Sequence, residues 1–461
     1  MSFKKIIFRS LLVILSGVLL YGIYYASQAF PILAGYGAKN LCSCVTLGNR
    51  LPEDVIKNEL GGGILTLGTF EFHAEDSSAT GNVFGFAKRK AIYRKGLGCT
   101  LVSEIEEQEL RSQRFSVAQS SAINQDTIPW PFGNLVRDTL LSGVDYEKIN
   151  QTLEDAFTEP SEEKNRRTRA MLVVYDGEII AEKYAEGFTK DSRLLGWSMT
   201  KSLTNALVGL LVKEGKLSLN DKAPIEEWRN DNRNAITIHN LMQASSGLAW
   251  KEIYSGASDA TKMLFRKRDA GIFASHVPLA KQPDTDFYYS SGTTNILSWI
   301  VRKHIDDSAY HSFPYTQLFY RLGMYSMVME PDAGGTFVGS SFSYATARDW
   351  ARFGLLYLND GVWGDKRILP EGWVAYTTTP AKGAEMGEYG AQFWLNAGAP
   401  GNPEKRMYPD VPSDLFWADG YEGQNVFILP SKNLVVVKLS LSSGNYLDDN
   451  KFLSDVIRAL P

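Results

Sequence analysis

The segment Trp197-Ser-Met-Thr-Lys-Ser-Leu-Thr204 opens the stretch that decides the fold. Apolar side chains recur through this stretch at three- and four-residue spacing, at Leu203, Ala206, Leu207, Leu210 and Leu211. The periodicity predicts a helix over residues 198–211, and Lys213-Glu-Gly215 supplies a glycine stop. Because side chains three residues apart share one helix face, the amine of Lys201 can reach the hydroxyl of Ser198.

A serine and a lysine at this spacing are a candidate nucleophile and base. A serine hydroxyl is a poor nucleophile without a base, and a lysine with its usual pKa of about 10.4 is protonated at neutral pH. Burial in an apolar helix environment would lower that pKa, and a helix N-terminus adds positive potential. The alternative is a serine that caps the helix beside a solvated lysine. The same spacing also occurs at Ser2–Lys5, in the targeting segment, and at Ser161–Lys164, in a charged linker.

The residues argue against a Ser-His-Asp triad of the α/β-hydrolase kind. Gly196-Trp-Ser-Met-Thr200 ends in threonine where the pattern Gly-x-Ser-x-Gly needs glycine. That fold also needs a histidine late in the chain, and the last one, His311, stands about 150 residues before the end. Partners of Ser198 other than histidine are therefore expected.

Two further segments carry chemistry. Phe287-Tyr-Tyr-Ser-Ser-Gly292 precedes a predicted helix over residues 293–300, and a tyrosine there could pass a proton between the serine and a leaving group. Ala418-Asp-Gly-Tyr-Glu-Gly-Gln424 precedes the last strands, and its glycines allow close approach of a substrate to backbone N–H groups that bind an oxyanion. The alternatives are an aromatic packing residue and an ordinary hairpin turn.

Together the three segments resemble the serine β-lactamase and penicillin-binding-protein superfamily, closest to its class C β-lactamase-related branch of esterases and 6-aminohexanoate-dimer hydrolases. The resemblance covers roughly residues 165–461. It is carried by Trp197–Asp221, by Ile238-His-Asn-Leu-Met-Gln-Ala-Ser-Ser-Gly247 and by Tyr289-Ser-Ser291. It implies an α/β (α+β) fold of the β-lactamase/transpeptidase type: an antiparallel sheet flanked by helices plus a helical subdomain.

The resemblance also implies a role for each matching residue. Ser198 would be acylated and Lys201 would be its base. Tyr289 would shuttle the proton, with Tyr288 the second choice. The backbone N–H groups of Ser198 and Tyr421 would form the oxyanion hole.

Two departures from the family pattern bear on the substrate. Ser291 replaces the amide of Tyr-x-Asn, and Ala418-Asp-Gly420 replaces the Lys-Thr-Gly whose lysine helps bind a substrate carboxylate. Asp419 and Glu422 would repel a carboxylate, which favours short amides or esters over β-lactams and stem peptides. The expected substrate-binding residues are Ser291, Asp419, Gly420, Gln424, Trp250, Tyr254 and Trp394, with Trp417 and Tyr421 nearby. For each aromatic residue, ordinary packing is the alternative.

The N-terminus predicts a membrane segment. Lys4, Lys5 and Arg9 precede an uncharged run of about 17 residues, Ser10–Ala26, at the lower limit for a spanning helix. Basic residues on its N-terminal side place that end in the cytoplasm and the catalytic domain on the exported side. A signal peptide cleaved near Ser27-Gln-Ala29, which would give a secreted protein, is the alternative.

Export makes one disulfide plausible among the three cysteines. Cys99 is the only distant partner for Cys42 or Cys44. These two would lie on the same face of a strand, so the residues do not choose between them. Three buried thiols are the alternative.

The expected organisation is an anchor or signal over 1–30, an accessory β-containing region over 31–150, a linker over 151–169 and the hydrolase domain over 170–461. In the accessory region, strands are expected at residues 64–72 and 82–86, with turns between them. A hairpin (residues 170–175 and 178–182) opens the hydrolase domain, and strands at 425–430 and 433–440 close it. Helices are expected at 236–242, 346–357 and 447–459.

Composition excludes several classes of function. The net charge of -4 offers no basic excess for nucleic acid. The five histidines are scattered without metal-ligand spacing, so neither a metal nor another cofactor is expected. We therefore expect a membrane-tethered serine hydrolase. The alternatives are a cell-wall DD-peptidase or β-lactamase, and a catalytically inactive, membrane-tethered binding protein.

Overall fold

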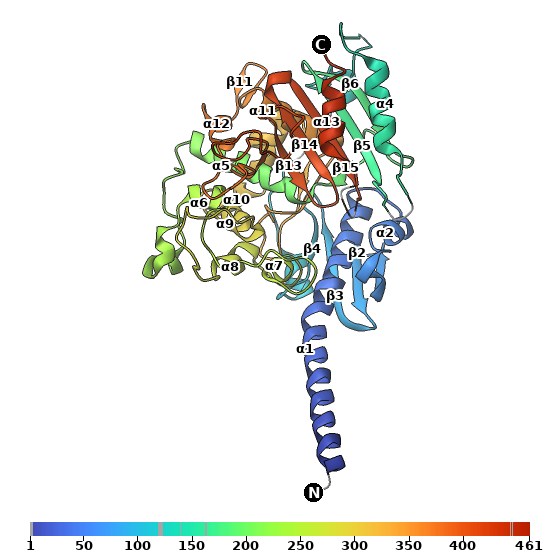
Figure 1. Ribbon diagram of the computed structural model, residues 1–461, viewed down its shortest axis with the longest axis vertical. Helices are drawn as coiled ribbons and strands as arrows, with labels where there is room; N and C mark the ends of the chain where they lie inside the picture. Colours follow the sequence, from blue (N-terminus) through green and yellow to red (C-terminus); the bar gives the residue numbers. More distant parts are fainter. Residues whose placement is uncertain (1–2, 119–122, 139, 162–163, 443, 445) are drawn as a thin grey trace.

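The computed structural model describes residues 3–118, 123–138, 140–161, 164–442, 444 and 446–461. Its longest element is helix α1 (Phe3–Thr46), which projects from the body as a single rod (Figure 1). The side chains around residues 10–25 are exposed, whereas most from residue 31 onward are buried. The stretch Ile6–Thr46 is long and apolar enough to cross a membrane. The expected apolar segment therefore continues without a break into the folded body.

The buried half of α1 packs against a four-stranded antiparallel sheet of order β1-β2-β3-β4. The strands are β1 (Gly68–His73), β2 (Ser78–Val83), β3 (Phe86–Arg94) and β4 (Gly98–Leu101). The expected strands at 64–72 and 82–86 were wrong in their bounds. Residues Gly63–Leu67 form a 3-10 turn, η1, and the return strand begins at Ser78. Phe84 and Gly85, both with positive φ, form the next turn, and pairing on both sides holds the weak strand formers of β2.

Cys42 forms the disulfide with Cys99, and Cys44 is a buried free thiol. The expectation that Cys42 and Cys44 share a strand face was wrong, because both lie in α1. In a helix, side chains two residues apart point about 200° apart, so only one of them can face β4. Beside this disulfide, the buried side chains of Lys39 and Glu330 form an ion pair.

The central sheet has six antiparallel strands in the order β12-β13-β14-β15-β5-β6. The hairpin β5 (Thr168–Tyr175) and β6 (Glu178–Tyr184) pairs with the last strands, β14 (Gln424–Leu429) and β15 (Leu434–Ser440). The two ends of the hydrolase domain thus close one sheet, as the sequence predicts. Helices α5 (Thr200–Lys213) and α11 (Ala347–Leu358) lie on one face, and α4 (Tyr146–Phe157) and α13 (Asp449–Ile457) on the other.

The helical part includes α6 (Ile238–Met242) and α9 (Ser291–Lys303), which confirm two predicted helices. The expected linker, 151–169, begins inside α4, and the division of the chain into separate units stays a prediction. The remaining α-helices and β-strands are α2 (Pro52–Asn58), α3 (Glu107–Ser112), α7 (Asp259–Arg266), α8 (Ala270–Ser275), α10 (Asp307–Tyr310), α12 (Trp373–Thr377), β7 (Leu194–Leu195), β8 (Val328–Met329), β9 (Ser343–Ala345), β10 (Val362–Trp363), β11 (Lys366–Arg367), β12 (Trp394–Leu395) and β13 (Phe416–Gly420).

Candidate active site

Ser198 lies in a 3-10 turn, η3 (Trp197–Met199), which leads directly into α5. The α-helix therefore begins at Thr200, two residues later than the apolar periodicity predicts. Trp197 has a φ of 46°, a left-handed conformation that is strained for a bulky residue. This turn leaves the Ser198 side chain part-exposed while the next turn of the helix is buried.

Lys201 is buried, with 2% of its surface exposed, and its amine has three hydrogen-bond partners. Lys201 Nζ donates to Ser198 Oγ (2.9 Å), to Ser291 Oγ (3.0 Å) and to the carbonyl oxygen of Ser340 (3.1 Å). Burial lowers the pKa of Lys201 to about 8, and the negative charges of Glu252 and Asp419 oppose this shift. About a tenth of the amine is therefore neutral at pH 7 and available to accept a proton.

Tyr289 lies on the extended segment that enters α9, and its hydroxyl interacts with the Ser198 side chain. Burial raises the pKa of Tyr289, so the phenol stays protonated and can donate. Lys201 Nζ lies 4.7 Å from the centroid of its ring, and Trp394 stacks on that ring at 5.4 Å. Tyr288 is 48% exposed, and its hydroxyl accepts a hydrogen bond from the backbone of Glu252. The structure thus brings Tyr289, and not Tyr288, to Ser198 and Lys201.

Glu252 is a residue of this site that the sequence reasoning missed. Ser291 donates to its carboxylate twice, from Oγ to Oε1 (2.5 Å) and from the backbone N–H to Oε2 (3.0 Å). The Tyr254 hydroxyl donates to Oε1 (2.7 Å), and Trp250 Nε1 also donates to the carboxylate. Ser291 therefore links the Lys201 amine to a carboxylate. The only signal in the sequence was the position of Glu252 between two expected site residues.

Of the expected aromatic residues, Tyr254 and Trp394 reach the site directly. Tyr254 Oη lies 3.1 Å from Ser291 Oγ, and 53% of the side chain is exposed, which places it at the rim. Trp250 instead lies beneath α9, where a Cβ added to Gly292 would lie 2.8 Å from its ring. Its indole N–H donates to the Glu252 carboxylate and so helps to hold that carboxylate in place.

The side chain of Gln424 also has a structural role. Gln424 Nε2 donates to the carbonyl oxygens of Ser440 (2.6 Å) and Tyr421 (3.1 Å), and Ser440 N donates back to Gln424 Oε1 (3.2 Å). These bonds fix the turn after β13 against β15.

The end of β13 lies against the turn that carries Ser198. A Cβ placed on Gly420 would be 2.2 Å from the carbonyl oxygen of Gly196, so only glycine allows this approach. Tyr421 follows directly, and its ring meets Trp197 edge-on at 5.8 Å. The backbone that follows β13 is therefore held beside Ser198.

Two carboxyl groups flank this strand end. Burial raises the pKa of Asp419 to about 6, although the charge of Lys438 and a hydrogen bond from Asn425 Nδ2 (2.8 Å) oppose the shift. Burial likewise raises the pKa of Glu422 to about 6, and its carboxylate accepts a hydrogen bond from Trp197 Nε1 (3.3 Å). Both groups are mainly anionic at neutral pH.

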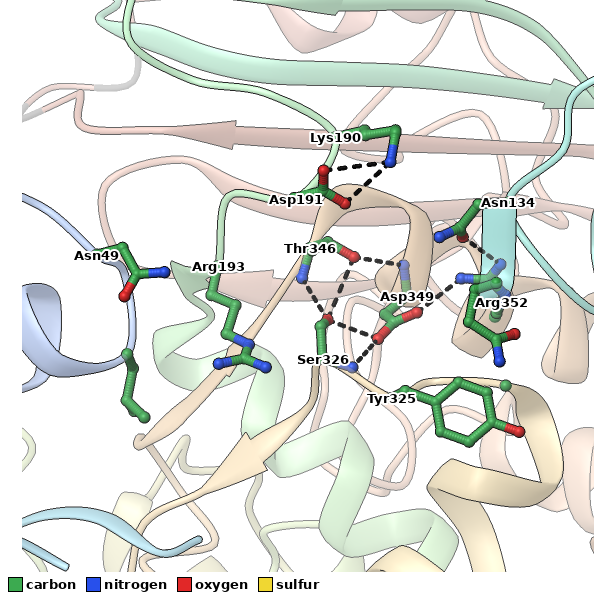
Figure 2. A pocket seen from close by; sticks show the side chains of 13 residues that line it. Asn49, Asn134, Lys190, Asp191, Arg193, Tyr325, Ser326, Thr346, Asp349 and Arg352 are labelled. Atoms are coloured by element: carbon green, nitrogen blue, oxygen red, sulfur yellow. Dashed lines mark hydrogen bonds and ion pairs between the residues drawn. The ribbon is translucent and has the colours of Figure 1, made fainter. Parts of the chain in front are cut away.

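A separate polar pocket of about 300 Å³ lies away from this site (Figure 2). Its polar groups bond to one another: Asp349 accepts from Arg352 (2.7 Å) and from Ser326 (2.6 Å). None of its lining residues contacts Ser198 or Lys201 in the described hydrogen bonds. Its lining residues are Leu47, Asn49, Gln125, Asn134, Lys190, Asp191, Arg193, Gly323, Tyr325, Ser326, Thr346, Asp349 and Arg352. Among the residues that the structure describes, no group of three or more His, Cys, Asp or Glu side chains could hold a metal ion.

An antiparallel sheet with a helical part, and a serine that begins a helix beside a buried lysine, define the class of serine hydrolases with a β-lactamase/transpeptidase-like fold. The sequence model of the Beta-lactamase family matches residues 153–456. The chain belongs to this family, which confirms the resemblance seen in the sequence.

Individual relatives agree with this family assignment. The chain is 26% identical over 334 residues to a 6-aminohexanoate-dimer hydrolase of Paenarthrobacter ureafaciens, a match that covers 63% of this chain and 79% of the relative. Its fold is similar to that of a family VIII carboxylesterase, with a TM-score of 0.53 at 14% identity over 70% of this chain and 99% of the other. A penicillin-binding protein homologue from Caulobacter crescentus gives a TM-score of 0.50 at 15% identity, over 71% of this chain and 98% of the other.

Proposed function

We propose that this protein hydrolyses amides or esters through a covalent acyl-Ser198 intermediate, with Lys201 as the base. The observation that carries the proposal is the buried Lys201 amine, 2.9 Å from Ser198 Oγ and with a pKa lowered to about 8. A lysine in this state can accept the serine proton, which a solvated lysine cannot do at neutral pH.

In the acylation step, neutral Lys201 takes the proton from Ser198 Oγ as this oxygen attacks the substrate carbonyl carbon. The backbone N–H groups of Ser198 and Tyr421 bind the oxyanion that forms. Tyr289 donates its proton to the leaving amine or alkoxide, and the proton on Lys201 replaces it. The close approach of Gly420 to Gly196 supports this arrangement.

Deacylation runs the same route with water as the nucleophile. Water loses its proton to the base as it attacks the acyl carbonyl, and Ser198 Oγ recovers a proton as it leaves. Ser291 and Glu252 are positioning residues in this proposal, because their hydrogen bonds hold the Lys201 amine toward Ser198.

We propose that the substrate carries a neutral or amine-bearing end and that β-lactams react poorly. At the strand end, this chain has Asp419 and Glu422 where a carboxylate-binding family member has a lysine. The relative named a 6-aminohexanoate-dimer hydrolase acts, by its name, on an amide dimer, which fits this class. A value of kcat/KM for penicillins or cephalosporins above that for every simple ester and amide would contradict this assignment.

We propose further that α1 anchors the protein and that the hydrolase domain faces the exported side. The Cys42–Cys99 disulfide supports an oxidising compartment. Protease added from that side should digest the domain in intact membranes. Digestion from the cytoplasmic side alone would reverse the orientation, and a soluble product beginning near Phe30 would favour cleavage.

The decisive experiment on the mechanism is fluorophosphonate labelling of Ser198→Ala. Both labelling and ester turnover should vanish while thermal unfolding stays unchanged. Ser161→Ala is the matched control, because it removes the serine of a second Ser-x-x-Lys pattern that is exposed. Undiminished turnover in Ser198→Ala would refute the mechanism.

A further inference from the structure

We propose that the Ser198 site opens at the bilayer surface and takes amphiphilic esters or amides whose alkyl chain remains in the lipid. This inference rests on the proposed acyl-serine hydrolysis and on α1 as a membrane span. It names the physiological substrate class, of which short soluble esters and amides would be only the reacting part.

The anchor helix is fixed rigidly to the catalytic body. α1 runs unbroken from Phe3 to Thr46, so no flexible linker separates the span from the fold. The Cys42–Cys99 disulfide and the buried ion pair between Lys39 and Glu330 hold its second half. Consequently, the body has one orientation and one height above the lipid.

The height of the folded body above the lipid follows from the rise per residue of α1. The uncharged run Ser10–Ala26 is, at 1.5 Å per residue, roughly 26 Å long, close to the thickness of the hydrocarbon core. Tyr24 and Tyr25 stand near the end of this run, where aromatic rings favour the lipid–water interface. The body begins at once, since Arg266 of α7 donates to the side chain of Gln28 (2.8 Å).

The loop that contains Glu252, Tyr254 and Gly256 connects the site to the level of Tyr25. Glu252 and Tyr254 bond to Ser291 in the site, and two residues later a Cβ placed on Gly256 would lie 3.2 Å from Tyr25 Oη. The rim of the site therefore reaches the outer edge of the hydrocarbon.

Ser198 itself lies farther from the hydrocarbon core than the rim of the site. Tyr36 of α1 stacks on Trp197, the residue before Ser198, at 5.9 Å. Tyr36 is eleven residues after Tyr25, a rise of roughly 16 Å along the helix. A substrate held in the bilayer by its chain would therefore extend a headgroup-proximal ester or amide up to Ser198.

Exposed apolar side chains surround the exit of α1. Ile253 is 52% exposed on the site loop, and Phe84 and Phe86 are 63% and 70% exposed on the β2–β3 hairpin. Phe84 lies edge-on to Phe30 of α1 at 6.0 Å. Figure 1 shows this hairpin and α7 on either side of α1 where the helix leaves the body. Contact with lipid would cover these side chains, which water leaves unfavourably exposed.

The test uses the full chain in phosphatidylcholine vesicles, with a soluble acetyl ester and a dodecanoyl ester of the same chromogenic alcohol. The wild type should hydrolyse the vesicle-bound dodecanoyl ester with the higher kcat/KM. Phe84→Asp should lower that value about tenfold, the effect of removing one large apolar contact with lipid, and leave the acetyl ester unchanged.

Leu140→Asp is the matched control. Leu140 is 72% exposed and near Gly143, which lies beside Pro461 at the end of the body far from the anchor (Figure 1). Equal effects of the two substitutions, or no gain from the longer chain in vesicles, would overturn the inference. If the wild type neither hydrolyses the acetyl ester nor is labelled at Ser198, the proposed hydrolase function is instead refuted.

Discussion

Replacing Glu252 with glutamine should lower the pH at which the enzyme becomes active. Hydrogen bonds of 3.0 Å and 2.5 Å join Lys201 Nζ to Glu252 Oε1 through Ser291 Oγ, so the two charges lie within about 5.5 Å. At an effective dielectric constant of about 20 and this separation, their attraction is about 3 kcal/mol, which corresponds to a pKa change of about two units for Lys201. Partial exposure of Glu252 screens this, and we expect a fall of about one unit.

The direction of the shift in the pH profile follows from the negative charge of Glu252. The Glu252 carboxylate stabilises protonated Lys201 and raises its pKa, while the reaction needs neutral Lys201. In the wild type, kcat/KM should therefore rise with pH through about 8 and then level off. In Glu252→Gln this rise should occur about one unit lower, although the plateau can fall because the amide binds Ser291 less strongly.

The assay is kcat/KM for a neutral chromogenic ester across pH 5.5 to 10, with Ser198 labelling as a check on the intact site. Asp419→Asn is the matched variant, because its charge acts on Lys201 in the same direction but is the weaker cause. It should shift the rise in the same direction by less. A rise that stays in place or moves upward in Glu252→Gln, with labelling retained, would refute the reasoning.

Three further outcomes are expected. Lys201→Ala should reduce turnover about a thousandfold or more, because base and nucleophile act as a unit; a tenfold loss would point to another base. Gly420→Ala should reduce acylation by at least tenfold and also lower the melting temperature, since its Cβ would meet a backbone carbonyl oxygen at 2.2 Å; wild-type kinetics would show that the strand end can move freely. Joint replacement of Cys42 and Cys99 by alanine should lower the free energy of unfolding by about 2–4 kcal/mol, as expected for a bridge that closes a loop of 57 residues; unchanged denaturant midpoints would contradict this.

Local patterns in the sequence predicted the strands that close the main sheet and the longer helices of the hydrolase domain. The hairpin of β5 and β6 and the final strands β14 and β15 are apolar runs separated by short turns, and they lie where the sequence places them. The accessory strands were harder, because Ser78–Val83 has weak strand propensity and is held by pairing with β1 and β3.

The residues of the candidate site likewise fall into those that local sequence predicts and those that depend on contacts between distant segments. The spacing of Ser198 and Lys201 is a property of one helix turn, and so was available from the sequence. Tyr289 needed the family resemblance, and Glu252 was missed, because its link to Lys201 passes through Ser291, 39 residues further along the chain. No periodicity records a contact between segments so far apart.

The sequence by itself determined the apolar N-terminal helix, the helix that follows Ser198 and the strands that close the main sheet, because each depends on side chains within a few residues of one another. Only the tertiary structure decided the partner of Cys99, the burial that lowers the pKa of Lys201, and the approach of the Tyr254 loop to α1. These depend on which distant segments share a volume, and that is set by the packing of the whole chain.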